Sequence, residues 1–159
     1  MKAIRPRTER GAAAVEFALV ATMFFTLLFG MIQYSLYFWS TQSAANAARD
    51  AARRGAVGQT CSELQNSVNS NVKLSSGNPT VSRKYYAAST TNFVPANEIT
   101  APPALSNTAN VRIVITYNSL SINFPFIPLP HGGAVTESSV AKVENFSSAG
   151  FAAGTFGPC

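Results

Sequence analysis

The two cysteines are the first residues whose chemistry bears on the structure. Cys61 and Cys159 are the only two in a chain of 159 residues. In an oxidising compartment an even count indicates a disulfide, and a bridge that closes a loop of this size stabilises a small domain by about 4 to 5 kcal/mol through loop-closure entropy. Two separate free thiols are the alternative. Together with His131 they do not make a metal site, because structural zinc takes four ligands.

Residues suited to catalysis are scarce. His131, the single histidine, lies in a Pro-His-Gly-Gly turn with no Cys, Asp or Glu beside it, so we interpret it as a surface-loop residue. Asp50 is the single aspartate, and the chain has no GxSxG, HExxH, CxxC or phosphate-binding glycine loop. We therefore predict no enzymatic activity, no metal and no cofactor.

The net charge of +5 does not indicate a nucleic-acid partner. The first ten residues supply +3 of it, and the basic residues beyond residue 57 are scattered along the chain. A nucleic-acid binder needs a basic face with aromatic side chains on which bases stack. We expect no nucleic acid among the partners.

Glu16 is a carboxylate at the start of an apolar run, which calls for a physical reason. Residues 12–15 before it are apolar, and residues 17–48 after it carry no charge. A carboxylate that enters a bilayer costs a few kcal/mol unless it pairs or stays near the interface. One explanation is a cap at the helix N-terminus, where the macrodipole favours an anion. The other is an ion pair within an assembly.

Residues 17–39 are long and apolar enough to cross a membrane as a helix. They extend about 35 Å at 1.5 Å per residue, against about 30 Å of hydrocarbon. Aromatic residues gather at the far end, and basic residues before Gly11 mark the near end as cytoplasmic. A cleaved secretory signal is the alternative, although its apolar region would be only about 7 to 15 residues long.

The residues after the apolar run continue the helix pattern. Residues 40–54 are mostly helix-forming, and Gly55 stands where a helix often stops. A helix over residues 12–54 would be about 65 Å long, so a stalk should project from the membrane. Ala44, Ala48 and Ala51 or Ala52 recur at helical spacing as a smooth stripe, on which another helix or the sheet of the outer domain can pack.

The sequence around Gly11 resembles the processing site of type IV pilin-like proteins. The string RGAAAVEFALV, with the later AARDAARRGA, resembles more narrowly the TadE-like pseudopilins of the Tad (tight adherence) pilus system. The resemblance implies a protein of the bacterial inner membrane that a prepilin peptidase cuts between Gly11 and Ala12. It also implies that Glu16 pairs with the new amine of Ala12 on a neighbouring subunit, which sets the register of assembly. The implied partners are other pilin-like subunits, the pilus assembly platform, the peptidase and membrane lipid.

Beyond Gly55 the composition turns to Ser, Thr, Asn, Pro and Gly. Residues 63–72 are expected to form a short helix, residues 75–79 a turn, and residues 111–117 (VRIVITY) the clearest strand. Weaker strand candidates are residues 80–88, 120–124 and 139–146. Residues 125–130 (PFIPLP) cannot be a central strand, so they form either a loop over the core of the sheet or an exposed partner-binding segment.

Together these patterns predict an α+β protein, in which a long N-terminal transmembrane helix continues as a stalk and packs against a small antiparallel β-sheet ectodomain. The expected parts are a cytoplasmic leader of residues 1–11 that is cleaved, a transmembrane helix of residues 12–40, an extracytoplasmic helix extension of residues 41–56, and a periplasmic or extracellular ectodomain of residues 57–159. We predict a minor pilin that acts in pilus biogenesis through helix–helix assembly. The alternative is an uncleaved single-pass envelope protein whose ectodomain binds a ligand or partner.

Overall fold

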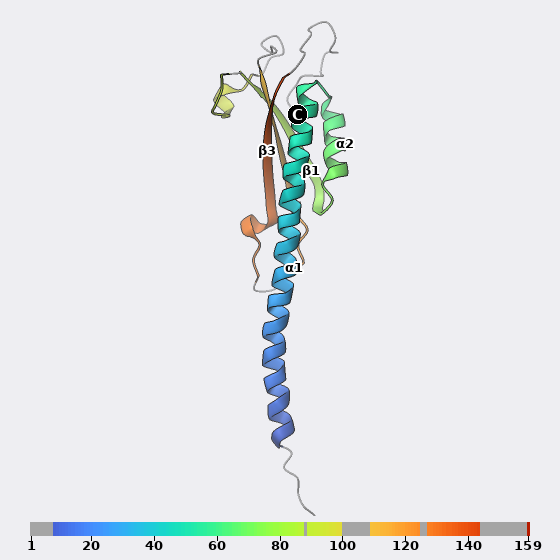
Figure 1. Cartoon of the computed structure of the whole chain (residues 1–159), viewed down its shortest axis with the longest axis vertical. Coiled ribbons are helices and arrows are strands. Elements are labelled where there is room, and N and C mark those ends of the chain that lie inside the picture. The colour runs from blue at the N-terminus through green and yellow to red at the C-terminus, as the bar shows by residue number, and fades with distance from the viewer. Residues whose placement is uncertain (1–7, 88, 100–108, 125–126, 144–158) are drawn as a thin grey trace, which may run out of the picture.

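The computed structural model describes residues 8–87, 89–99, 109–124, 127–143 and 159. One long helix, α1 (Thr8–Ala56), carries a second helix and a three-stranded sheet around its C-terminal half, while its N-terminal turns, before Phe29, stand alone (Figure 1). The 49 residues of α1 reach about 73 Å at 1.5 Å each. The predicted α+β arrangement of a long apolar helix and a small antiparallel sheet is confirmed.

The role of Gly55 near the C-terminal end of α1 differs from the prediction. Gly55 lies inside the helix, and the residue with left-handed backbone that follows the end is Gly58, with φ of 85°. The N–H of Gly58 donates to the Gly55 carbonyl at 3.3 Å. Gly55 has a packing role instead, because a Cβ there would lie 3.5 Å from side-chain atoms of both Val111 and Ile113.

The second helix, α2 (Cys61–Asn71), confirms the short helix expected in this region. Thr60 and Glu63 cap it reciprocally: the Thr60 hydroxyl accepts from the Glu63 N–H, and the Glu63 carboxylate accepts from the Thr60 N–H at 2.9 Å. The backbone hydrogen bond from Thr60, together with that from its hydroxyl, lowers the pKa of Glu63. Leu64 and Val68, one turn apart, are the buried face of α2.

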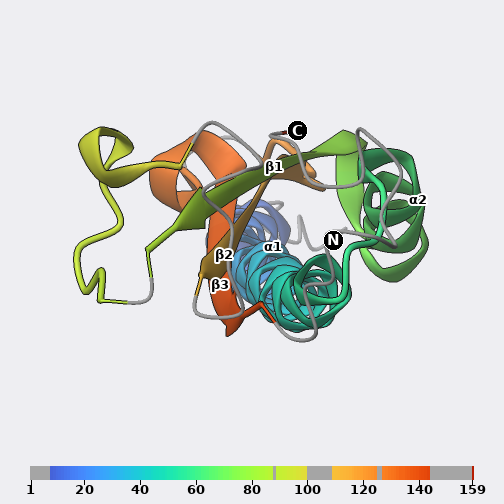
Figure 2. The ribbon, with the colours of Figure 1, turned by 90° about the horizontal axis from the view of Figure 1, so that it is seen from above.

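The sheet contains β1 (Ser75–Tyr86), β2 (Asn110–Ser119) and β3 (Ala134–Lys142), all antiparallel, with β2 in the centre. The predicted strand of residues 111–117 is confirmed as the body of β2, and its alternate residues Val111, Ile113, Ile115 and Tyr117 are buried. Helix α1 packs on β2 and β3, and α2 packs on β1, so the helices cover one face of the sheet (Figure 2).

Two local expectations were wrong, and a third was confirmed only in part. Residues 75–79 are not a turn but the beginning of β1, where the register to β2 shifts between Ser76 and Thr80 and Gly77 has φ of 98°. Residues 120–124 form no strand. The strand expected at residues 139–146 begins at Ala134, directly after a short 3-10 helix, η3 (Pro130–Gly133), and residues 144–146 lie outside the described part. Another 3-10 helix, η1 (Pro95–Asn97), follows β1.

Candidate functional site

The N-terminal turns of α1 contain the predicted cleavage site and the predicted assembly residue. Gly11, Ala12 and Glu16 all lie in α1, and residues 11–20 are exposed throughout. A Cβ placed on Gly11 would meet nothing within 4 Å. In the described part of the chain Glu16 has no hydrogen-bond or ion-pair partner, so its carboxylate is open to a group from another molecule.

The apolar surface of α1 is also bare in this half. Phe17, Leu19, Met23 and Phe24 are exposed, and so are other large apolar side chains as far as Met31. Within the described residues, α1 is the one helix long and apolar enough to cross a membrane, and its most apolar stretch has a mean hydropathy of 2.1. Its threonines fit an apolar medium, because each hydroxyl donates to a backbone carbonyl one turn earlier, from Thr22 to Ala18 and from Thr26 to Thr22.

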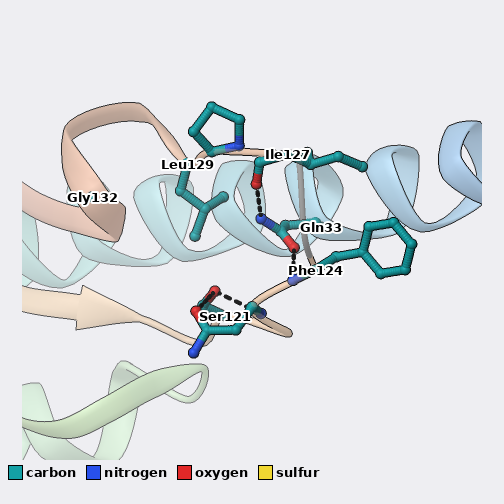
Figure 3. A pocket seen from close by; sticks show the side chains of 8 residues that line it. Gln33, Ser121, Phe124, Ile127, Leu129 and Gly132 are labelled. Atoms are coloured by element: carbon teal, nitrogen blue, oxygen red, sulfur yellow. Dashed lines mark hydrogen bonds between the residues drawn. The ribbon is translucent and has the colours of Figure 1, made fainter.

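Gln33 is the most polar side chain of the apolar run, and the structure buries it to 2% exposure. Its amide bridges two points of the segment between β2 and β3 (Figure 3). The Nε2 atom donates to the carbonyl of Ile127 at 2.8 Å, and Oε1 accepts from the N–H of Phe124 at 3.4 Å. The pairing satisfies the amide within the protein and ties the ectodomain to the apolar half of α1.

Other contacts hold the described residues of this segment, 120–124 and 127–130, which we call the basal loop, against α1. The Phe124 ring stacks on Phe29 with 5.0 Å between centroids, and the hydroxyl of Tyr34 donates to the carbonyl of Pro128 at 3.0 Å. Gly30 makes room for it, because a Cβ there would lie 3.1 Å from Ile127 Cδ1.

The sequence left residues 125–130 as either a cover for the core or a partner segment. Leu129 is partly buried and packs against the core, whereas Phe124, Ile127 and Pro128 contact α1 itself. Pro125 and Phe126 lie outside the described residues. The described residues of this segment therefore lie mainly on the long helix, and among them Leu129 reaches the core.

The other half of α1 is already occupied by the ectodomain. From Ala44 onward its buried face is made of small residues that let the sheet approach closely: Ala44, Ala47, Ala48, Ala51, Ala52, Gly55 and Ala56. The Tyr117 hydroxyl donates to the Ser40 carbonyl at the lower edge of this contact. The alanine stripe therefore binds the sheet of its own chain, and the bare half of α1 is the part left for other helices.

The predicted disulfide is present: Cys61 and Cys159 are bonded, with 5.8 Å between their Cα atoms. Arg83 lies beside it and is fully buried, at 0% exposure. Its Nη1 donates to the Gln59 carbonyl at 2.5 Å and its Nη2 to the sulfur of Cys61 at 3.3 Å. Burial lowers the pKa of Arg83, although the charge of nearby Tyr85 opposes this effect, and burial raises the pKa of Tyr85 to about 12.

The burial of Arg83 beside the disulfide was not predicted from the sequence, in which Arg83 was one of several scattered basic residues. The signal that could have found it is the period of two in β1, where Arg83 falls on the same inner face as Val81 and Tyr85. His131 is exposed, as expected, with φ of 51° in η3. Among the residues that the structure describes, no three of His, Cys, Asp and Glu gather where they could hold a metal.

Comparison with known families supports the resemblance seen in the sequence. The family model described as TadE-like protein matches residues 11–53. That range covers nearly all of α1 and contains Gly11, Ala12 and Glu16, whereas the ectodomain lies outside it. Neither the comparison with curated proteins nor that with solved structures gave a match.

Proposed function

We propose that this TadE-like chain is a minor pilin-like subunit of a Tad-type pilus assembly machine, which acts through helix–helix assembly and not through catalysis. The observation that carries the proposal is that the two ends of α1 differ in how much of their surface is covered. The half that bears the family-matched processing residues is bare and apolar, while the other half is occupied by its own ectodomain. A bare apolar helix face of this size needs lipid or other helices around it.

The membrane arrangement is part of the proposal. The helix crosses the inner membrane with the basic leader in the cytoplasm, in agreement with the positive-inside bias. The ectodomain then lies in the periplasm or outside the cell, where an oxidising environment suits the Cys61–Cys159 bridge. A prepilin peptidase removes residues 1–11, and the mature chain begins at Ala12.

Glu16 is the assembly residue in this mechanism. Its carboxylate pairs with the α-amine of Ala12 on a neighbouring subunit, which offsets the cost of each charge in an apolar bundle. Because one short ion pair forms at a single axial stagger, it selects the register between helices. The exposure of Glu16, with no partner in the described part of its own chain, supports this role. The partners are other pilin-like subunits and the assembly platform.

Cleavage is tested by mass spectrometry of the intact chain co-expressed with the cognate peptidase. We expect a product that begins at Ala12, and we expect Gly11→Ala to abolish it. Cells that lack the peptidase are the control. A native chain that still begins at Met1 would contradict the processing step and favour the uncleaved envelope protein.

The role of Glu16 is tested by recovery of partner pilins from detergent extracts. Glu16→Gln should leave insertion and leader removal intact but lower the amount of co-purified partner at matched membrane abundance. Thr22→Val is the matched control, because it removes a polar group from the same exposed part of α1 without changing charge. Equal recovery with the Gln variant and wild type would show that Glu16 is a local helix cap.

A further inference from the structure

The basal loop contacts α1 well before the apolar run ends. Its contacts lie between Phe29 and Tyr34, whereas the apolar run extends to Trp39. The ectodomain therefore reaches down along the part of the helix that would cross the membrane (Figures 1 and 3).

The depth of this contact follows from helix geometry. A hydrocarbon core of about 30 Å takes about 20 residues of helix, so a core that begins at Glu16 ends near Leu36. Gly30, beneath Ile127, then lies about 9 Å inside the boundary. A core that excluded the whole contact would have to begin near residue 9, and it would enclose Glu16, and Arg10 in the uncleaved chain, at a cost of several kcal/mol.

Between Phe124 and Leu129 the described carbonyl groups of the loop are satisfied within the protein. Backbone groups in hydrocarbon must be satisfied within the protein. The four described carbonyls between Phe124 and Leu129 each accept a hydrogen bond from the protein: Phe124 from the N–H of Ile127, Ile127 from Gln33, Pro128 from Tyr34, and Leu129 from the N–H of Gly132. Prolines at 125, 128 and 130 bring no N–H donor.

The loop carries no charged side chain, and its polar side chains Ser121 and Asn123 are hydrogen-bonded to each other at 3.0 Å. Residues 113–136 contain no Asp, Glu, Lys or Arg. Leu120 and Ile122 are 43% and 46% exposed, and the N–H of Leu120 donates to the carbonyl of Leu74 at 3.0 Å. Leu74 in turn lines a surface groove with Lys73 and the exposed Phe38 and Trp39. The base of the ectodomain thus presents apolar side chains, with the Lys73 ammonium beside them: Leu120, Ile122, Leu74, Phe38 and Trp39.

From these observations we propose that the basal loop lies in the ectodomain-side leaflet and contacts phospholipid acyl chains, with Trp39 and Lys73 at the level of the headgroups. The inference rests on the proposed function, because it takes α1 to span a membrane. It extends that function by making the ectodomain a partly embedded domain. Its height and tilt above the bilayer are then fixed by the loop.

Tryptophan fluorescence of the full chain in phosphatidylcholine vesicles tests the depth. Trp39 is the only tryptophan, so Trp39→Phe gives a dark background for single reporters. Phe124→Trp reports on the loop, Phe25→Trp on the middle of the span, and Val57→Trp on the exposed residue that follows α1. Ile122→Trp is a second loop reporter at an exposed site, where a larger ring does not disturb packing. Formation of the disulfide, read by non-reducing mass analysis, shows that each variant is folded.

Lipids brominated on their acyl chains should quench both loop reporters strongly, and their emission should be blue-shifted relative to that of Val57→Trp. Quenching of the loop reporters no stronger than that of Val57→Trp, while Phe25→Trp is quenched, would place the loop in water and overturn the inference alone. Loop reporters shielded from both brominated lipid and aqueous acrylamide would mean burial against a second protein, which also overturns it. An unquenched Phe25→Trp would overturn the membrane span itself, and with it the proposed function.

Discussion

Replacement of Gln33 by leucine tests whether one amide holds the ectodomain against the apolar half of α1. The change keeps the approximate size of the side chain and its apolar stem, but it removes both hydrogen bonds to the basal loop. The Ile127 carbonyl, at 2.8 Å from Nε2, and the Phe124 N–H, at 3.4 Å from Oε1, lose their partner.

The expected cost is dominated by the shorter bond. A buried polar group left without a partner costs about 1 to 3 kcal/mol, and the 3.4 Å contact adds little because it is long. Since about 1.4 kcal/mol is a factor of ten, detachment of the loop should become about 5 to 140 times more frequent. The Phe29–Phe124 stacking remains, so the loop should open more often without being lost from the helix.

Amide hydrogen exchange of the full chain in detergent micelles measures this opening. The reporters are the N–H groups of Phe124, Ile127 and Leu129, because the prolines between them have none. Gln42→Leu is the matched control, since it makes the same change on the same helix at an exposed position. If the loop in the Gln33 variant exchanges no faster than in the Gln42 variant, the amide bridge does not hold the ectodomain in place.

Three further predictions concern the ectodomain of the full chain in detergent. Loss of the Cys61–Cys159 bridge in the variant Cys159→Ser should lower the free energy of unfolding by about 4 to 5 kcal/mol, and an unchanged urea midpoint would contradict this. Ala48→Leu, at a fully buried position, should destabilise by about 1 to 3 kcal/mol in thermal unfolding through overpacking, whereas the same residue at exposed Asn46 should change little. Because burial raises the pKa of Tyr85 to about 12, its contribution is complete below its ordinary value of about 10 and is lost as the pH rises toward 12. The pH profiles of wild type and Tyr85→Phe should therefore diverge above pH 10, and parallel profiles would refute the assignment.

The elements that the sequence predicted well are those with strong local patterns. The unbroken apolar run predicted α1, and the alternation of Val111, Ile113 and Ile115 predicted β2, because each pattern matches the period of its own structure. The stripe around Ala48 was also recognised, although its partner was left open between another helix and the sheet. Only the tertiary arrangement could choose between the two.

The elements that were misjudged depend on pairing between distant segments. The first residues of β1 read as a turn because Gly77, Asn78 and Pro79 interrupt them, yet pairing with β2 keeps them extended across a register shift. The first residues of β3, from Ala134, show only weak alternation of apolar and polar residues in the sequence, and the strand is fixed by its register to β2.

The candidate site shows the same limit. Gly11, Ala12 and Glu16 could be singled out because their signal is a short local motif, and their cleavage and pairing remain predictions. The contact between Gln33 and Ile127 joins residues 94 positions apart, and no local pattern points from one to the other. From the sequence, Gln33 could be recognised only as a polar residue within the apolar run of residues 17–39, without any indication of its partner.

The position of the disulfide determines how the protein would carry a mechanical load. Cys61 follows the end of α1 by five residues, and all three strands lie inside the loop that the bridge to Cys159 closes. Tension applied between α1 and Cys159 passes through covalent bonds from the helix to Cys61 and across the two sulfur atoms. The sheet lies outside this path, so a pulling force that would unzip its strands in the reduced chain leaves them unstressed in the oxidised one.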